Sequence, residues 1–261
     1  MKPAFVIVHG LTFPPPTFDR LRNALEGAGY DVAIPRMPSV GEGVIGATMA
    51  TEVAAVRAAM APALEAGKDI VLMGHSYGGI IITPTALGYT KTEREAQGLE
   101  GGVKAVVYLE AFAGWERGKY PMDVVFGSGS GIPEMFKPLV IDGKPTDNIP
   151  VPKSPTDMEK QASQFLFFNT CTPEDTEWCM GLLESMSLGA ALEKTEVVPA
   201  DLKASLTYIV GEKDNAMQPA IAERFVAGTP GMKEVRMDTG HAPFVSHVDE
   251  LAKILEGIAQ E

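Results

Sequence analysis

Short apolar runs alternate with segments of helical periodicity along most of the chain. The run Ala4–Val8 is apolar without interruption, which is typical of a strand buried on both faces of a parallel sheet. Strand and helix signals that alternate in this way predict an α/β fold, with a mostly parallel central sheet flanked by helices. The predicted strands are 4–8, 31–34, 69–73, 103–109, 206–210 and 234–237.

Helical periodicity is clearest at 49–64 and near the end of the chain, where apolar side chains recur at spacings of three and four. Thr17 is predicted to cap the first helix. Pro62 predicts a kink or an early end of the second helix, because proline lacks the N–H that a helix interior needs. The predicted helices are 17–26, 49–64, a segment beginning at 79, 219–227 and 248–259.

Residues 112–199 interrupt the alternation. Their first part is rich in Gly, Pro and Ser at 127–155, and helical patterns follow at 158–168 and 173–186. We therefore predict a core domain formed by 1–111 and 200–261, with 112–199 inserted as a largely helical cap.

Residues 74–78 read Gly-His-Ser-Tyr-Gly and lie between a predicted strand and a predicted helix. A Gly-x-Ser-x-Gly motif in this context predicts a sharp turn that holds the serine, here Ser76, above the edge of the sheet. Side chains at positions 74 and 78 would collide with the neighbouring strand or helix, which explains the two glycines. Ser76 is the candidate nucleophile.

A serine hydroxyl needs a base to accept its proton. Of the four histidines, His75 adjoins Ser76 on a sharp turn and should point away from it, and His247 is expected at the surface. His241 follows the last predicted strand, at the sheet edge where Ser76 also lies. We therefore predict His241 as the base.

The base in turn needs a carboxylate that fixes its tautomer. Asp214 follows the predicted strand 206–210 and is the preferred acid. Glu110, at the end of the strand 103–109, is the alternative acid. Asp238 is too close to His241 along an extended chain to orient it.

An oxyanion formed during acyl transfer requires two backbone N–H donors. One is expected from Tyr77, the residue after the nucleophile, and the other from Leu11, in the loop after the first strand. His9 in that loop is expected to brace it by hydrogen bonding.

The amino-acid composition and net charge limit the classes of binding partner that we expect. The 261 residues carry a formal net charge of −12, which disfavours nucleic acid and anionic membranes as partners. The two cysteines, Cys171 and Cys179, exclude a disulfide framework and are expected to be reduced, although one bridge stays open. We predict no metal site from Cys and His spacing, no signal peptide and no membrane span, and hence a cytoplasmic protein.

Together these motifs make the chain resemble the α/β-hydrolase superfamily over nearly its whole length. The segment from Phe168 to Asp175 is similar to a cap motif of small serine esterases that include plant methylesterases, hydroxynitrile lyases and related microbial and fungal hydrolases. The resemblance implies no metal or organic cofactor. The lyases of this group typically carry Thr where Gly10 stands and Lys where Ala242 stands, so these two positions favour ester hydrolysis.

We expect a serine hydrolase that cleaves a small, mostly apolar carboxylic ester or lactone through an acyl-enzyme. Two alternatives stay open: a C–C lyase or isomerase with the same triad, and a ligand-binding receptor with residual hydrolase activity. The expected partner is a small ester, with neither nucleic acid nor membrane, and a homodimer is left open. The candidate residues of the substrate pocket are Gly10, Thr12, Phe13, Phe136, Phe165, Phe168, Trp178 and Met186.

Overall fold

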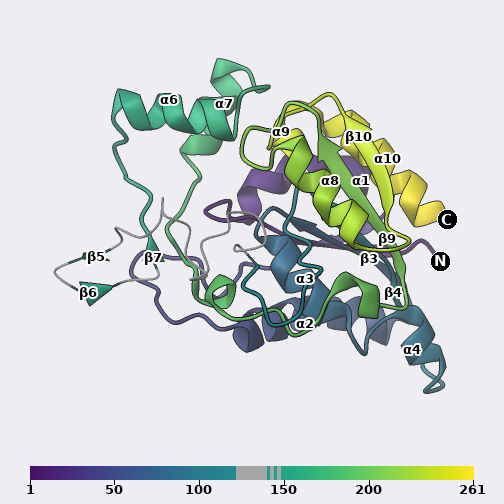
Figure 1. Cartoon of the computed structure of the whole chain (residues 1–261). Coiled ribbons are helices and arrows are strands. Elements are labelled where there is room, and N and C mark those ends of the chain that lie inside the picture. Colours follow the sequence, from purple (N-terminus) through teal and green to yellow (C-terminus); the bar gives the residue numbers. More distant parts are fainter. Residues whose placement is uncertain (122–139, 142–143, 146–147) are drawn as a thin grey trace.

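A computed structural model describes residues 1–121, 140–141, 144–145 and 148–261 (Figure 1). Its centre is a six-stranded sheet in the order β10-β9-β4-β3-β1-β2, and each neighbouring pair is parallel. This confirms the predicted α/β fold. The strands are β1 (Ala4–Val8), β2 (Asp31–Ala33), β3 (Asp69–His75), β4 (Gly102–Leu109), β9 (Ser205–Gly211) and β10 (Lys233–Met237).

The strands bury both of their faces. In β1, Phe5 and Ile7 belong to one buried apolar cluster, whereas Val6 and Val8 belong to the other. The first cluster includes side chains of α1 (Asp19–Gly27) and α10 (Val248–Gln260), and the second includes side chains of α2 (Met49–Glu65), α3 (Gly78–Ala86) and α8 (Pro219–Gly228). Each face of the sheet is thus covered by helices, as the uninterrupted apolar strand predicts.

Several predicted helix ends are wrong. Residues Pro15–Phe18 form a 3-10 turn and α1 begins only at Asp19, so Thr17 does not cap it; its hydroxyl donates to the Pro14 carbonyl at 2.7 Å. The helix α2 continues through Pro62 to Glu65 rather than ending early. Pro62 lies in the last turn of α2, where its missing N–H removes one hydrogen bond, and the helix ends three residues later.

Two short helices were not predicted, α4 (Lys91–Glu95) and α9 (Pro243–Ser246). Between β4 and β9 the chain leaves the sheet and forms α6 (Asp157–Leu166) and α7 (Pro173–Met180), which stand apart from the sheet in Figure 1. The helix α7 is shorter than predicted, because the chain turns at Gly181 and residues Met186–Ser187 form strand β8.

Short strands accompany the helices of this insertion. β8 pairs antiparallel with β7 (Asn148–Ile149), and β5 (Val140–Ile141) pairs antiparallel with β6 (Lys144–Pro145). Two 3-10 turns, Gly189–Leu192 and Pro199–Asp201, lead back to the sheet. The division of the chain into a core and a cap at 112–199 stays a prediction. Within the described residues, no helix combines the length and the apolar character that crossing a membrane requires.

Candidate active site

The motif around Ser76 forms a strained turn between β3 and α3. Ser76 has a φ of 51°, a left-handed conformation that a serine adopts only when its surroundings enforce it. A Cβ at position 78 would collide with the carbonyl oxygen of Val8, and one at position 74 would lie 2.7 Å from the Gly78 carbonyl group. The predicted reason for both glycines is therefore confirmed. Ser76 itself is 9% exposed.

His241 and Asp214 lie together at the same edge of the sheet. Asp214 follows β9 and His241 follows β10, and both side chains are buried. The Nδ1–H of His241 donates to Asp214 Oδ2 at 2.7 Å. Asp214 Oδ1 accepts the backbone N–H groups of Ala216 and Met217 at 2.7 and 2.8 Å. These bonds suit an ionised carboxylate that fixes the tautomer and the orientation of the imidazole.

The strained turn formed by residues 74–78, called the elbow below, is joined to the His241 loop by His75. His75 was expected only to point away from Ser76. The Nε2–H of His75 donates to the backbone carbonyl of His241 at 2.9 Å, and the two rings lie 4.7 Å apart. Complete burial lowers the pKa of His75 well below its usual value, with a smaller contribution from His241. His75 is therefore a neutral brace between the segment of Ser76 and the segment of His241.

The loop after β1 packs directly against the elbow. A Cβ at Gly10 would lie 2.7 Å from His75 Nδ1 and 3.0 Å from Ser76 Cβ. The next residue along this loop, Leu11, is one of the two predicted donors of the oxyanion hole. The other predicted donor, Tyr77, directly precedes α3. The roles of Leu11 and Tyr77 stay predictions.

His9 braces this loop, as predicted. Its Nδ1–H donates to the Gly10 carbonyl at 3.0 Å, and its Nε2 accepts the Met37 N–H at 3.3 Å. Burial lowers the pKa of His9 to about 4, so the ring is neutral near pH 7. The neutral tautomer satisfies both bonds at once.

Three other residues weighed from the sequence, Glu110, Asp238 and His247, lie in three different environments. Glu110, the alternative acid, is buried, and its Oε2 lies 3.9 Å from His241 Nδ1. Asp238 is exposed and forms an ion pair with Lys213 at 2.7 Å, which agrees with its exclusion as the acid. His247 is half-buried rather than at the surface, and its Nδ1 lies 2.8 Å from the Ser246 hydroxyl.

Asn169 and Thr170 contact both loops of the site, a role that the sequence analysis did not identify. The side-chain amide of Asn169 donates to the Lys213 carbonyl at 2.7 Å, next to Asp214. The hydroxyl of Thr170 accepts the Gly240 N–H at 3.0 Å, next to His241. The sequence carried one signal for them: both belong to the segment 168–175 that resembles the esterase cap motif.

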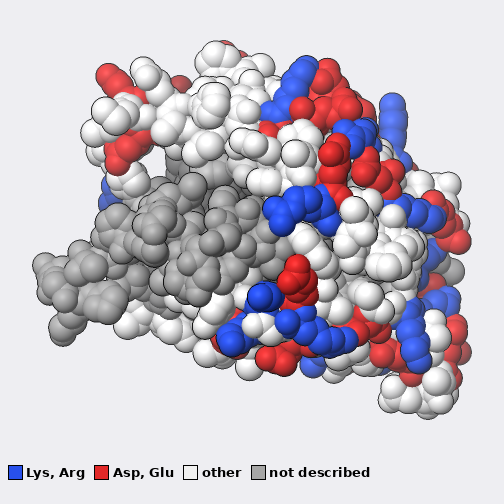
Figure 2. Space-filling model, in the orientation of Figure 1, with Lys and Arg blue, Asp and Glu red and all other residues white. Residues whose placement is uncertain are grey.

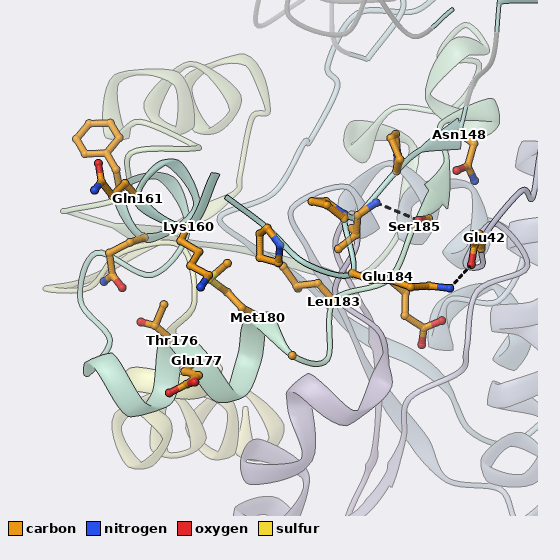
Figure 3. A pocket seen from close by; sticks show the side chains of 18 of the residues that line it. Glu42, Asn148, Lys160, Gln161, Thr176, Glu177, Met180, Leu183, Glu184 and Ser185 are labelled. Carbon is orange, nitrogen blue, oxygen red and sulfur yellow. Dashed lines mark hydrogen bonds and ion pairs between the residues drawn. The ribbon is translucent and has the colours of Figure 1, made fainter. Parts of the chain in front are cut away.

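A cavity of 1510 Å³ lies beside α6 and α7. Figure 3 shows its lining, in which the side chains of Met180 and Leu183 lie beside charged groups such as Lys160 and Glu177. Asn169 also lines it, so the cavity adjoins the residue that holds the Asp214 loop.

The predicted pocket residues have different environments. Phe165 lines the cavity and is 63% exposed. Gly10 and the half-buried Thr12 lie in the loop beside Ser76. Phe136 lies outside the described residues. The other four pack against neighbouring side chains: Phe13, Phe168 and Met186 are buried in the core clusters, and Trp178 is half-buried beneath Arg20.

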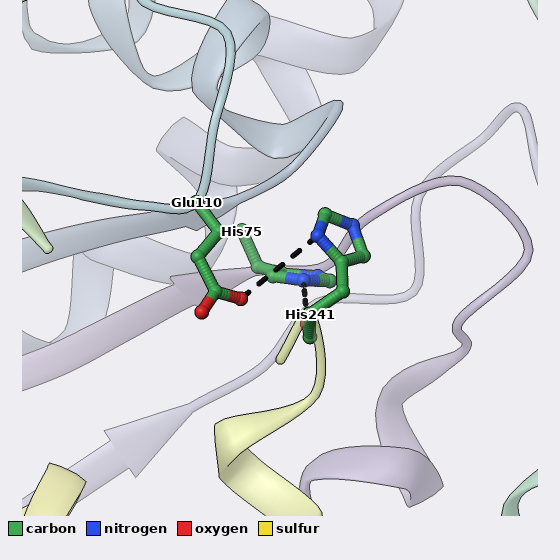
Figure 4. A group of neighbouring side chains, drawn as sticks. All are labelled: His75, Glu110 and His241. Carbon is green, nitrogen blue, oxygen red and sulfur yellow. Dashed lines mark hydrogen bonds and ion pairs between the residues drawn. The ribbon is translucent and has the colours of Figure 1, made fainter. Parts of the chain in front are cut away.

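One group of side chains has the composition of a metal site. His75, Glu110 and His241 offer donor atoms within 4.8 Å of one another (Figure 4). However, His75 Nε2 is bonded to the His241 carbonyl, and His241 Nδ1 is bonded to Asp214. Since these nitrogens already carry protons in hydrogen bonds, the geometry fits a braced imidazole better than a metal centre. Cys171 and Cys179 are free thiols, as expected.

Comparisons with known proteins agree with this fold. The model of the alpha/beta hydrolase family matches residues 5–254. The alpha/beta hydrolase nvfD of Aspergillus novofumigatus (strain IBT 16806) is 26% identical over 263 residues, which cover 100% of this chain and 98% of nvfD. The crystal structure of the pyrethroid hydrolase PytH with BIF has a TM-score of 0.74 at 19% identity, covering 99% of this chain and 98% of PytH. The methylesterase MES16 from Arabidopsis has a TM-score of 0.73 at 19% identity and 99% coverage of both chains.

Proposed function

Because the chain belongs to the alpha/beta hydrolase family, we propose that it hydrolyses carboxylic esters or lactones through an acyl-enzyme on Ser76. The single observation that carries this proposal is the buried bond between His241 Nδ1 and Asp214, at the sheet edge where the strained Ser76 also lies. Esterases among the similar structures support ester hydrolysis as the general reaction.

The proposed reaction uses groups already described. His241 Nε2 takes the proton of the Ser76 hydroxyl while the oxygen attacks the ester carbonyl. Asp214 stabilises the imidazolium that forms, and the N–H groups of Leu11 and Tyr77 bind the oxyanion. The tetrahedral intermediate collapses, and the alcohol leaves with the proton from His241. Water, activated by the same imidazole, then releases the acid and restores Ser76.

The substrate proposed is a small, mostly uncharged ester. The cavity beside α6 and α7 is not lined by Ser76, Asp214 or His241 and adjoins the site through Asn169. Its lining combines apolar side chains such as Ile45, Phe165 and Met180 with charged ones such as Lys160 and Glu177. Acidic and basic side chains are intermixed on the face shown in Figure 2, and the net charge of −12 opposes polyanionic ligands. An uncharged ester avoids both the repulsion and the cost of desolvating a charge.

The lack of space at position 10 disfavours a reaction of the hydroxynitrile lyase type. A side chain at position 10 would press against His75 and Ser76, so the threonine typical of those lyases has no room in this arrangement. Ala242, where the lyases carry lysine, is completely buried. Hydrolysis requires neither group.

A panel of p-nitrophenyl esters with acyl chains of graded length tests the proposal. The wild-type protein should release p-nitrophenol, and Ser76→Ala should abolish turnover. Ser205→Ala is the matched control, because Ser205 lies at the opposite end of the sheet in β9 and should leave the rate unchanged. Mass spectrometry should find a fluorophosphonate probe on Ser76. Turnover that persists in Ser76→Ala would refute the proposal.

A further inference from the structure

Glu110 is a buried carboxyl group that the proposed reaction does not use. It follows β4 with a φ of 48°, and its side chain is 1% exposed. Neither of its carboxyl oxygens has a hydrogen-bond partner among the described residues. A buried polar group without such a bond costs free energy, so a group of this kind in a packed site calls for an explanation.

The side chain of Glu110 packs beside the Asp214 loop and the imidazole of His241. Its Oε1 occupies the space that a side chain at Gly211 would fill, directly before the Asp214 loop. Its Oε2 lies 3.9 Å from His241 Nδ1, about 1 Å beyond hydrogen-bonding distance. Figure 4 marks this contact with a dashed line. Glu110 therefore faces the nitrogen that Asp214 already binds at 2.7 Å.

Burial and the neighbouring Asp214 both favour the protonated form of Glu110. Burial raises the pKa of Glu110 well above its usual value, and the carboxylate of Asp214 raises it further. Among the described residues, the other titratable groups nearby are His75, His241 and Tyr208, and the hydroxyl of Tyr208 donates to the Ala111 carbonyl. The two carboxyl groups beside one imidazole thus differ in environment, because Asp214 accepts hydrogen bonds and Glu110 accepts none among the described residues.

We propose that Glu110 is a reserve positioning carboxyl for His241, which takes over the bond to Nδ1–H when the Asp214 carboxylate is absent. This inference rests on the proposed function of the same site. Without Asp214, one of the two causes that raise the pKa of Glu110 is gone; as the pH rises Glu110 releases its proton, moves by about 1 Å and accepts Nδ1–H. His241 Nε2 then still takes the proton of Ser76, and Glu110 balances the imidazolium.

Four proteins test this: the wild type, Glu110→Gln, Asp214→Ala and the double variant. Loss of the acid from a serine triad lowers kcat about 10⁴-fold. We expect Asp214→Ala to lose only about 10²-fold and the double variant to lose about 10⁴-fold, whereas Glu110→Gln alone stays within about threefold. Alanine is chosen at 214 because the amide of asparagine would donate to Nδ1 and impose the wrong tautomer.

The dependence of activity on pH distinguishes a role of Glu110 in positioning His241 from a purely structural role. In Asp214→Ala, the rise of activity with pH should occur at a higher pH than in the wild type, since Glu110 must first ionise. The double variant should lack this rise. Glu52→Gln in the Asp214→Ala background is the matched control, because Glu52 is also a buried carboxyl group but binds the Ser39 N–H instead. It should change neither the rate nor the profile.

A proton NMR spectrum provides a readout that does not depend on turnover. The hydrogen-bonded Nδ1–H of His241 should give a downfield resonance in the wild type and in Asp214→Ala, and the double variant should lose it. Equal rates and equal spectra for Asp214→Ala and the double variant, both folded by circular dichroism, would overturn the inference. Absence of Ser76-dependent turnover in the wild type would instead refute the proposed function, while the spectra still decide the role of Glu110.

Discussion

Replacing Glu110 by glutamine should stabilise the protein increasingly as the pH rises. Burial and the nearby Asp214 raise the pKa of Glu110 in the folded state, whereas the same carboxyl ionises at about pH 4.3 in an unfolded chain. Between these two values the unfolded chain releases a proton that the folded protein keeps, so wild-type stability falls with pH. Each pH unit in this window costs the wild type about 1.4 kcal/mol relative to the variant.

Urea unfolding of both proteins at pH 4, 5, 6 and 7 measures this difference. At pH 4 the carboxyl is largely protonated in both states, so the pH-dependent part of the difference between wild type and Glu110→Gln nearly vanishes, which makes this measurement an internal control. Above pH 5 the free energy of unfolding of the variant should gain on the wild type by about 1.4 kcal/mol for each pH unit, until the folded-state pKa is reached. A difference that stays constant from pH 4 to pH 7 would show that Glu110 ionises in the folded protein at the same pH as in the unfolded chain, and the reasoning would fail.

Three further substitutions have distinct expected outcomes. Gly78→Ala should lower the free energy of unfolding by about 3 kcal/mol or prevent folding, seen by thermal melting, because the new Cβ meets the Val8 carbonyl. Thr170→Ala removes the acceptor of the Gly240 N–H, so steady-state kinetics should show kcat about tenfold lower at unchanged KM. Arg36→Ala breaks an exposed ion pair and should change stability in urea by less than about 1 kcal/mol.

The sequence was most predictive where one local pattern decides the outcome. The run Ala4–Val8 is apolar at every position, and the structure buries it on both faces of the sheet. The spacing of glycines around Ser76 predicts the elbow, because only a residue without Cβ fits two positions away from the nucleophile. Asp214 and His241 could be selected because parallel strands bring their carboxyl ends to one edge.

The sequence was less predictive where a boundary or a role depends on distant contacts. The helix α1 begins two residues after Thr17, since the preceding prolines form a 3-10 turn. His75 was excluded as a base because neighbours on a sharp turn point apart, yet its ring reaches the carbonyl of a residue 166 positions away. Similarly, the contact of Asn169 with the Lys213 carbonyl spans 44 positions and follows no local periodicity.

The charge state of the site follows from which buried groups have hydrogen bonds. Asp214 accepts backbone N–H groups and the imidazole N–H, so it can stay ionised when removed from water. Glu110 has no such donor among the described residues, and burial favours its protonated form at the same edge. A second carboxylate beside His241 would stabilise the imidazolium at rest and leave less of the free base that Ser76 needs. In the proposed reaction the single negative charge that balances the imidazolium is therefore that of Asp214, to which His241 Nδ1 is bonded.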